Sequence, residues 1–418
     1  MSSDGQRRVL YLSRDGILDG LGESQILAYL RALAADHAFW LLTFEKATAP
    51  SPAVRAALAA TGIEWTPFRF HGRDRPVRAV LGLLGCMGLA AWLVLTRRIR
   101  IIHARSYVPC ALATAVRWLC LGYPRVLFDT RGLWVDERAE AGGWDRAGVA
   151  YRLAKAAERF LLRRASGVVT LTERARAEVT ALAGVRWSAT AVIPTCVDVE
   201  RFRPAADATL PPALSRDWRQ RLVFVYTGAA GFWQSPESLA DFFAAVREER
   251  ADAVFVCLVR VGGDAMRRAL ARAGLEGASH VEEAMPPADL PRWYRIASFG
   301  VVWYRPGFSR IGTFPTKLGE YLACGLPVIV AGATADSVEL VTRERVGVVV
   351  RDFSRQAYRE AVTEALGLAK AGDLAARCRG VAERHLAVTV GAERYREVYR
   401  RLGGERSGPV SPAGEGAR

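Results

Sequence analysis

The sequence predicts an α/β protein made of two Rossmann-like, doubly wound domains that face a central cleft. With 418 residues the chain is too long for one ordinary hydrophobic core, so two domains are expected. Short apolar runs alternate with helical segments, a pattern typical of parallel sheets covered by helices. The alternation begins with a strand, a glycine-containing loop and a helix, and it begins again at Leu222–Tyr226.

The first strand is expected at Arg8–Ser13, followed by a loop that contains Gly20 and Gly22, and then by a helix at Glu23–Ala35. This order opens many doubly wound sheets, although the loop lacks the G-x-G-x-x-G spacing of dinucleotide-binding proteins. The glycine loop could face a ligand, or it could be a turn without one.

Polar side chains follow two later strands of the first domain. His103 and Asp129 stand at the carboxyl ends of strands, where parallel sheets place their ligands. The loop after Asp129 carries Arg131, Asp136 and Glu137, which could contact a substrate or could hold the loop by ion pairs. The other strands and helices expected here are Ala38–Leu42, Ser51–Thr61, Ile63–Trp65, Arg100–Arg105, Val126–Asp129, Arg146–Arg164, Gly167–Leu171 and Ala191–Pro194.

The segment Ala79–Thr96 is ambiguous because its eighteen residues carry no charge, which is the lower limit for a transmembrane helix. It lies between strands of one expected sheet, has three glycines and is flanked by arginines on both sides. We therefore expect a long helix that is partly buried and partly at a membrane interface. The alternative is a core helix with a solvated basic rim.

The domain boundaries are expected near the proline-rich segment after Pro194. We assign residues 1–204 to the first domain, 205–385 to the second, 386–402 to a last helix that crosses back to the first, and 403–418 to a disordered tail. The strands and helices expected after Leu222–Tyr226 are Val254–Arg260, Asp289–Ala297, Gly300–Tyr304, Val346–Val350, Tyr358–Ala369 and Ala392–Leu402.

The most informative stretch runs over residues 309–330. Its middle reads as a short helix with Pro315 in the first turn, Thr313 or Thr316 as a cap and Gly325 after the last turn. Lys317 stands in the first turn, where the helix dipole disfavours a cation, so a bound anion such as a phosphate is expected there. The 58 basic residues include only four lysines, which suggests that a compact charge is selected at this position. The alternative is an ordinary surface pair of Lys317 with Glu320.

This stretch resembles the nucleotide-sugar site of family 4 glycosyltransferases, which have the GT-B fold. The resemblance is to a branch that carries Pro-Thr-Lys, two residues, Glu-Tyr-Leu-Ala, one residue, Gly, one residue and Pro-Val, as in 315–328 here. It covers most of residues 7–350 and includes Gly20–Gln25 and the Asp-Arg-Gly-Trp-Asp-Glu run within 129–137. The wider family often has a second Glu where this chain has Gly312.

The resemblance implies a role for each motif. Glu320 would hold ribose hydroxyls, basic residues would hold the diphosphate, and the loop after Asp129 would line the acceptor side. Family members often carry Arg and Lys after the first strand of the second domain, whereas the turn at 227–231 here has neither. The expected catalytic residues are Arg310, Lys317 and Glu320; the expected donor-binding residues are Gly20, Gly22, Gly228, Arg305, Thr313, Thr316 and Tyr321; the expected acceptor-side residues are His103, Asp129, Arg131, Asp136 and Glu137.

The resemblance further implies transfer of a sugar, with retention of configuration, from a nucleotide-diphosphate sugar to an acceptor hydroxyl in polysaccharide, lipopolysaccharide or glycolipid assembly. Cations and a helix N-terminus would stabilise the charge on the leaving diphosphate. No Asp-x-Asp pair requires a metal, and no cofactor is expected besides the donor. The alternatives are a nucleotide-sugar epimerase or hydrolase of the same fold, or a non-catalytic scaffold that binds the donor.

Charge and cysteine content bear on partners and location. The net charge of +15 suggests anionic partners, and the basic flanks of 79–96 favour a peripheral site on the inner face of the membrane. Nucleic acid is not an expected partner, because the arginines are dispersed and no recognition motif occurs. Seven scattered cysteines and no visible signal peptide indicate reduced thiols in a cytoplasmic protein.

Overall fold

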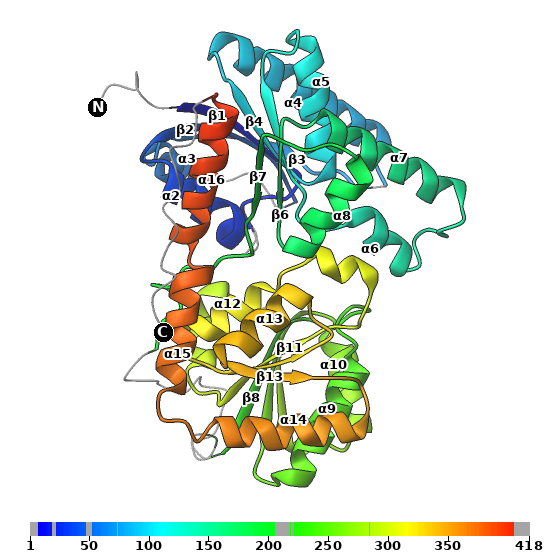
Figure 1. Ribbon diagram of the computed structural model, residues 1–418, viewed down its shortest axis with the longest axis vertical. Helices are drawn as coiled ribbons and strands as arrows, with labels where there is room; N and C mark the ends of the chain where they lie inside the picture. The colour runs from blue at the N-terminus through cyan, green and yellow to red at the C-terminus, as the bar shows by residue number, and fades with distance from the viewer. Residues whose placement is uncertain are drawn as a thin grey trace.

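The structure is a computed structural model that describes residues 7–18, 22–46, 52–72, 74–204, 218, 221–283 and 285–404. It contains two parallel sheets, one above the other in Figure 1, with helices on both faces of each sheet. The predicted α/β architecture of two doubly wound domains is therefore confirmed.

The first sheet has seven parallel strands in the order β3-β2-β1-β4-β5-β6-β7. Its interior strands are nearly continuous apolar runs, as in the buried Val9–Leu12, because both faces of the sheet are covered. The strands are β1 Arg7–Ser13, β2 His37–Glu45, β3 Ile63–Arg69, β4 Ile101–Arg105, β5 Arg125–Asp129, β6 Gly167–Thr170 and β7 Ala189–Val192.

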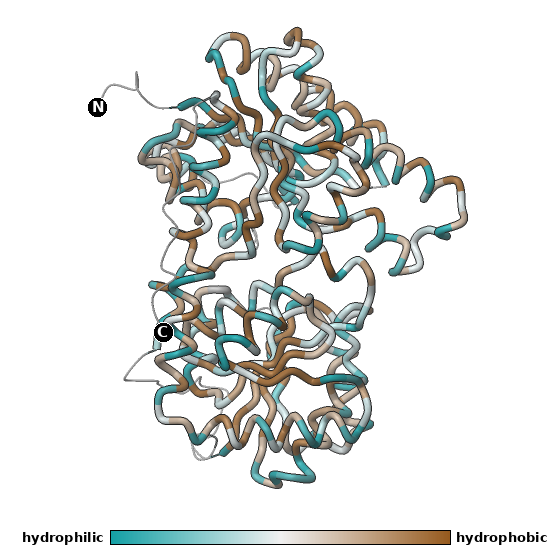
Figure 2. Tube along the Cα trace, in the orientation of Figure 1, coloured by the Kyte–Doolittle hydropathy of each residue, from teal (hydrophilic) through white to brown (hydrophobic). Residues whose placement is uncertain are grey.

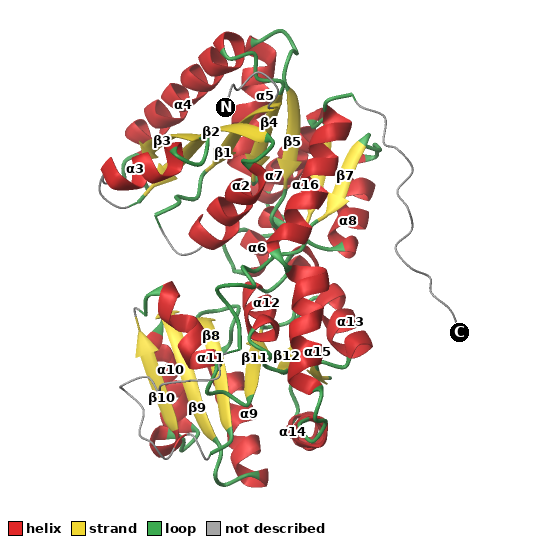
Figure 3. Cartoon of the chain, turned by 90° about the vertical axis from the view of Figure 1, so that its left-hand side faces the viewer, coloured by secondary structure: helices red, strands yellow, loops and turns green. Residues whose placement is uncertain are grey.

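Two hydrophobic cores lie on the two faces of this sheet, one beneath α4, α5, α7 and α8 and the other beneath α2 and α16. Figure 3 shows this sheet from the side, with helices on both of its faces. The helical segments of the first half are η2 Glu23–Leu27, α2 Ala28–Leu33, α3 Pro52–Ala59, α4 Pro76–Thr96, α5 Tyr107–Leu119, α6 Trp134–Glu140, α7 Val149–Arg164 and α8 Glu173–Ala183.

The second sheet repeats the same winding with six parallel strands in the order β10-β9-β8-β11-β12-β13. The strands are β8 Val223–Ala229, β9 Val254–Val261, β10 Ser279–Glu283, β11 Phe299–Trp303, β12 Val328–Ala331 and β13 Gly347–Val350. The helical segments are α9 Pro236–Glu249, α10 Gly263–Arg272, η4 Glu276–Ala278, η5 Pro287–Asp289, α11 Leu290–Tyr294, η6 Phe308–Gly312, α12 Thr316–Ala323, α13 Ala335–Glu344, α14 Arg355–Leu368, α15 Leu374–Val381, η7 Ala382–Leu386 and α16 Val388–Leu402.

The last helix, α16, lies against the first sheet although it follows the second in sequence (Figure 1). Tyr395 meets Tyr29 of α2 edge to face at 5.5 Å, and Arg396 binds Asp36 with an Nε–Oδ2 distance of 2.8 Å. The chain thus crosses between the sheets twice. The two crossings run side by side, because the Val197 N–H donates to the Leu386 carbonyl at 2.7 Å and the Val388 N–H to the Val197 carbonyl at 3.0 Å.

The carboxyl ends of strands in the two sheets face one another. η6 follows β11, α6 follows β5, and side chains of these two short helices bond across the interface. Ligands of doubly wound sheets bind at the carboxyl ends of the strands, so this topology fixes where a site should lie.

Candidate functional site

The helix α12 forms the centre of the site, and seven of its eight residues are buried. Pro315 occupies the position before its first residue, and Gly325 takes the left-handed conformation after its end, with φ of 75°. The predicted cap is wrong, because no side chain caps the helix. Pro315 at the cap position has no side-chain acceptor for the N–H groups at the start of α12, and the Thr313 hydroxyl donates to the Arg310 carbonyl at 3.0 Å.

Lys317 is a buried cation in the first turn of α12, with 7% of its surface exposed. Its Nζ lies 4.1 Å from the centroid of the Tyr226 ring and 5.4 Å from that of Tyr304, and it has no hydrogen-bond partner among the described residues. Burial lowers the pKa of Lys317 to about 7, against the opposing charge of Glu320. An ammonium held in this way lacks an anion, and a phosphate oxygen would supply one.

Gly228, at the end of β8, lies beside the amine of Lys317. Its φ is 145°, a conformation that L side chains rarely adopt, and a Cβ added there would stand 2.9 Å from the Lys317 Nζ. The predicted donor-binding glycine is therefore brought beside Lys317, where only hydrogen leaves room for the amine.

Glu320 and Tyr321 continue the buried face of α12. The Tyr294 hydroxyl donates to Glu320 Oε2 at 3.0 Å, and burial raises the pKa of Glu320, opposed by that hydrogen bond and by Lys317. The Tyr321 hydroxyl accepts the Thr227 N–H at 2.9 Å, and the side chain has no exposed surface. Tyr321 therefore braces the turn after β8, whereas Glu320 lies beside the unpaired cation.

Arg310 joins the two domains at this site. Its guanidinium lies 4.0 Å from the centroid of the Trp233 ring, and Nη2 binds Glu137 Oε1 of α6 at 3.1 Å. Burial raises the pKa of Glu137, opposed by Arg310. Next to this pair, both the N–H and the hydroxyl of Ser309 donate to Glu140. Two acids of the first domain thus bind η6, Glu137 through the cation Arg310 and Glu140 through its neighbour Ser309.

The remaining predicted donor residues differ in exposure. Arg305 is exposed and lies 4.6 Å from the centroid of the Phe232 ring, while Thr313 and Thr316 are half-buried. Gly22 is buried, and a Cβ there would meet the Gly16 carbonyl at 1.9 Å, so the backbone approach itself requires glycine. Gly20 lies outside the described residues.

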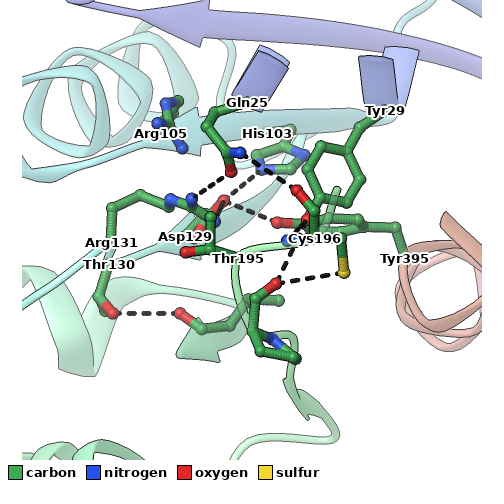
Figure 4. Close-up of polar contacts among 12 residues, drawn as sticks. Gln25, Tyr29, His103, Arg105, Asp129, Thr130, Arg131, Thr195, Cys196 and Tyr395 are labelled. Carbon is green, nitrogen blue, oxygen red and sulfur yellow. Dashed lines mark hydrogen bonds and ion pairs between the residues drawn. The ribbon is translucent and has the colours of Figure 1, made fainter. Parts of the chain in front are cut away.

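On the first domain, His103 and Asp129 belong to a buried polar network that includes α16 (Figure 4). His103 Nε2 is 3.4 Å from Asp129 Oδ2, and the Tyr395 hydroxyl donates to the same oxygen at 2.8 Å. The other ring nitrogen of His103 is 2.7 Å from the Tyr399 hydroxyl. Burial lowers the pKa of His103 despite Asp129, so the imidazole is neutral at pH 7.

Arg131 connects this network to the chain crossing. Its Nη2 donates to the Gln25 side-chain oxygen at 3.2 Å, and the Gln25 amide donates to the Cys196 carbonyl at 3.2 Å (Figure 4). The pKa of Asp129 is lowered because Arg131 and His103 together outweigh its burial. His103 and Asp129, predicted at the acceptor side, are thus sealed beneath tyrosines, and a supporting role fits this placement better than direct contact.

Asp136 lies apart from both groups. It binds Lys155 at 3.0 Å and accepts the Tyr151 hydroxyl at 2.7 Å, so it ties α6 to α7. The predicted acceptor residues are therefore not one cluster. Glu137 binds Arg310, the cation of the second domain. Arg131 forms a second group with Asp129 and His103. Asp136, which links α6 to α7, belongs to a third group with a structural role.

Several contacts at the site escaped prediction from the sequence. Tyr226, Trp233 and Tyr294 form the aromatic walls around the two cations and Glu320. Arg105, at the end of β4, is 8% exposed with an unpartnered Nε that lies 3.6 Å from Asp15. Of the three aromatic residues, Trp233 lies in the loop after β8, whereas Tyr226 lies within β8 and Tyr294 in α11, so they share no pattern in the sequence.

The chain matches described families over most of its length. Residues 22–201 match Glycosyltransferase Family 4, and residues 221–367 match Glycosyl transferases group 1. None of the curated proteins compared with the chain matches it.

Solved structures share the fold at low identity. Sucrose-phosphate synthase from Thermosynechococcus elongatus is 16% identical, with a TM-score of 0.74, covering 96% of this chain and 100% of that one. HepE from Anabaena, in complex with UDP-glucose, is 13% identical, with a TM-score of 0.68, over 95% and 99% of the chains. WaaG, a glycosyltransferase involved in lipopolysaccharide biosynthesis, is 13% identical, with a TM-score of 0.61, over 96% and 100%.

The two family matches cover one domain each, and together they confirm the resemblance to family 4 glycosyltransferases. The chain belongs to the glycosyltransferases of the GT-B fold.

Proposed function

We propose that the protein transfers a sugar from a nucleotide-diphosphate sugar to an acceptor hydroxyl with retention of configuration, without a metal, in the assembly of a polysaccharide, lipopolysaccharide or glycolipid. The observation that carries the proposal is the unpartnered ammonium of Lys317, buried at the start of α12 beside Gly228 and Glu320. Solved structures of the same fold with UDP and UDP-glucose support a nucleotide-sugar donor.

In the proposed mechanism, the diphosphate of the donor lies at the N-terminus of α12. Lys317 supplies one positive charge to the departing phosphate, and the N–H groups of the helix supply hydrogen bonds. Arg310 supplies the second charge after Glu137 releases it. Lys317 and the helix N–H groups are fixed before the reaction, so they stabilise the charge as the glycosidic bond breaks without having to reorganise.

Glu320 positions the donor and takes no part in bond breaking. Its free oxygen accepts hydrogen bonds from ribose hydroxyls, while Tyr294 fixes the other oxygen. Retention follows if the acceptor hydroxyl attacks from the side that the leaving phosphate vacates, with that phosphate taking the proton. No side chain then serves as a nucleophile, and trapping a covalent sugar–enzyme adduct would contradict this step.

The test of function mixes the purified protein with labelled UDP-sugars and GDP-sugars and a lipid extract. Transfer of label to lipid supports the proposal. Conversion of the nucleotide sugar without an acceptor would indicate an epimerase or hydrolase, and binding without turnover would indicate a scaffold.

Lys317→Ala should lower transfer by roughly 10²-fold or more, because it removes a charge that stabilises the leaving diphosphate. The matched control is Lys370→Ala, which removes an exposed lysine after α14 and should leave transfer unchanged. Initial rates at saturating donor measure the effect. Equal rates for the two variants would remove Lys317 from the mechanism.

A further inference from the structure

The outer surface of the first domain carries an apolar helix, α4, whose outer side is exposed within the described part of the chain. Within the described part of the chain, α4 is the one helix long and apolar enough to cross a membrane. Its best 18-residue window has a mean hydropathy of 2.1, yet only 22% of that window is buried. Figure 2 shows the hydrophobic colouring of this region of the trace.

The two sides of α4 differ in their surroundings. Its inner side packs into the core of the first sheet through Cys86, Ala90, Leu93 and Val94. Its outer side presents a stripe at helical spacing in which every side chain is more than half exposed; the stripe consists of Val77, Val80, Leu81, Leu84, Trp92 and Leu95. Isolated exposed apolar residues are ordinary, whereas a stripe along a whole helix marks an interaction surface.

The neighbouring helix α5 extends this apolar surface. Trp118 and Leu119 at its end are 55% and 59% exposed, and Leu121 in the following turn is 97% exposed. The Trp118 ring meets Phe160 of α7 edge to face at 5.8 Å, and Phe160 is itself 40% exposed. The helices α4, α5 and α7 lie on the outside of this domain (Figure 1), and each carries exposed apolar side chains.

Exposed arginines flank the stripe at both ends. Arg75 and Arg78 stand at the start of α4, and Arg97 and Arg98 follow its last residue. Cations at the rim of an apolar surface match the anionic headgroups that border the acyl chains of a bilayer, and each strengthens binding to such a surface.

We propose that α4 and the end of α5 dock the protein on an anionic membrane, with α4 lying in the plane of the interface. A spanning α4 is excluded by the fold, because it connects β3 to β4 of one hydrogen-bonded sheet and its inner side belongs to that sheet's core. A second copy of the chain is a poorer occupant, since a face-to-face pair would bring these arginines toward one another. The proposal does not depend on the donor chemistry.

Sedimentation with vesicles tests the surface. The full chain should sediment with phosphatidylcholine vesicles that contain phosphatidylglycerol, less in high salt, and only weakly with pure phosphatidylcholine. Leu84→Glu should lower the bound fraction by roughly tenfold, because it places a charge in the interface. Its control is Val261→Glu, at a 64% exposed apolar residue of the second domain, which should bind as the parent does.

A second set of variants tests the contribution of positive charge by removing two arginines at a time. Arg97→Gln with Arg98→Gln should weaken binding to the anionic vesicles, whereas Arg268→Gln with Arg272→Gln, on exposed positions of α10, should not. Absence of binding at low salt, or equal effects of test and control variants, would overturn the proposal. A dimer in solution that Leu84→Glu dissociates would assign the surface to a second copy instead.

The depth of α4 in the bilayer distinguishes docking at the interface from insertion into the acyl chains. All seven cysteines of the chain are buried, so a thiol-reactive fluorophore should label Leu84→Cys selectively. Lipids brominated near the headgroup should quench the fluorophore more than lipids brominated near the chain end. The reverse order would show that α4 reaches the middle of the bilayer and would overturn the in-plane arrangement.

Discussion

At the scale of single residues, the unusual feature is a lysine that the fold buries without a partner. Burying an ammonium without a hydrogen-bond partner costs free energy. The rings of Tyr226 and Tyr304 and the nearby carboxylate of Glu320 offset part of this cost. A residue maintained in this way is better suited to an incoming phosphate than to the stability of the empty protein.

The lowered pKa of Lys317 has a measurable consequence for stability. Its pKa falls from 10.5 to about 7 on folding, so between these pH values the unfolded chain binds a proton that the folded chain lacks. Stability from this residue therefore rises with pH across that window. In Lys317→Met the slope of unfolding free energy against pH should be smaller by up to about 1.4 kcal/mol per pH unit. Urea unfolding at several pH values measures it, and identical slopes would contradict it.

The pair of Arg310 and Glu137 makes a second prediction. Because the Glu137 carboxylate competes with phosphate for the same guanidinium, Glu137→Gln should tighten binding of the free nucleoside diphosphate by roughly two- to fivefold. Arg310→Gln should weaken it. Titration calorimetry measures both, with Glu360→Gln as the control, since Glu360 pairs with Arg351 at an exposed position.

A looser complex in Glu137→Gln would mean that this acid helps to hold the donor. The double variant Arg310→Gln with Glu137→Gln separates the cases, because removing the acid should have no effect once the guanidinium for which it competes with phosphate is gone. An unchanged acceptor KM in Glu137→Gln would argue against the acceptor contact implied by the family resemblance.

Residue roles were the hardest part to predict from the sequence. Lys317 was identified because it breaks the helix-dipole rule in a chain with few lysines. The bond of Arg310 to Glu137 joins residues 173 positions apart, and no local pattern encodes such a contact. The same separation hides the hydrogen bond to Asp129, an expected acceptor-side residue, from Tyr395, which lies 266 positions later.

At the scale of elements, α12 is held in place by close packing on β11. A Cβ added at Gly300 of β11 would stand 2.3 Å from the Tyr321 ring, and a ring in a packed core has nowhere to move. The strand and helix can therefore approach only where one side chain is absent.

Gly300→Ala should destabilise the protein by about 1–3 kcal/mol through overpacking, and it should weaken donor binding because α12 shifts. The control is Gly367→Ala in α14, where an added Cβ meets nothing within 4 Å, and which should be neutral or stabilising by up to about 1 kcal/mol. Thermal unfolding compares the two. A stable Gly300→Ala protein with normal donor affinity would show that α12 tolerates displacement.

Helices and strands were more predictable than side-chain contacts, because they depend on runs of neighbouring residues. The apolar run ending in Pro327-Val328-Ile329-Val330 predicts β12, and Gly325 predicts the end of α12. The cap of α12 was predicted wrongly because the helix begins at Thr316, so that Pro315, which has no side-chain acceptor, occupies the cap position and Thr313 lies two residues before it.

At the scale of the whole molecule, the last helix of the chain belongs to the core of the first domain. Six buried side chains of α16 contribute to that core; they are Val388, Ala392, Tyr395, Val398, Tyr399 and Leu402. Each larger apolar side chain buried in this way contributes about 1.5–3 kcal/mol, so together they rival the net stability of a domain.

Val398→Ala should therefore lower protection from hydrogen exchange in β1 and α2, which are nearly 400 positions away in sequence, while β9 of the second sheet keeps its protection. The matched control is Glu393→Gln on the exposed side of the same helix, where Glu393 is 62% exposed. Hydrogen-exchange mass spectrometry reports each segment. Loss of protection confined to α16 itself would show that the helix is an accessory rather than a part of the core.

The doubly wound architecture was predictable because the alternation of strands and helices occurs twice along the sequence. The contacts that position the two sheets relative to each other were not predictable from local patterns. They include the bond from the Thr195 hydroxyl, which donates to the Phe314 carbonyl at 2.9 Å across the interface. Only the folded chain brings such groups together.

The paired crossings also bear on how such enzymes can be recombined. Because the backbone passes between the sheets at Val197 and returns at Ala387, exchanging the second domain for another requires two junctions rather than one. Those junctions are neighbours in space, joined by a short parallel bridge, so a foreign domain need match only one local geometry. A chimera cut at both points preserves α16 with its own core, whereas one cut only at the first would pair that core with an unrelated helix.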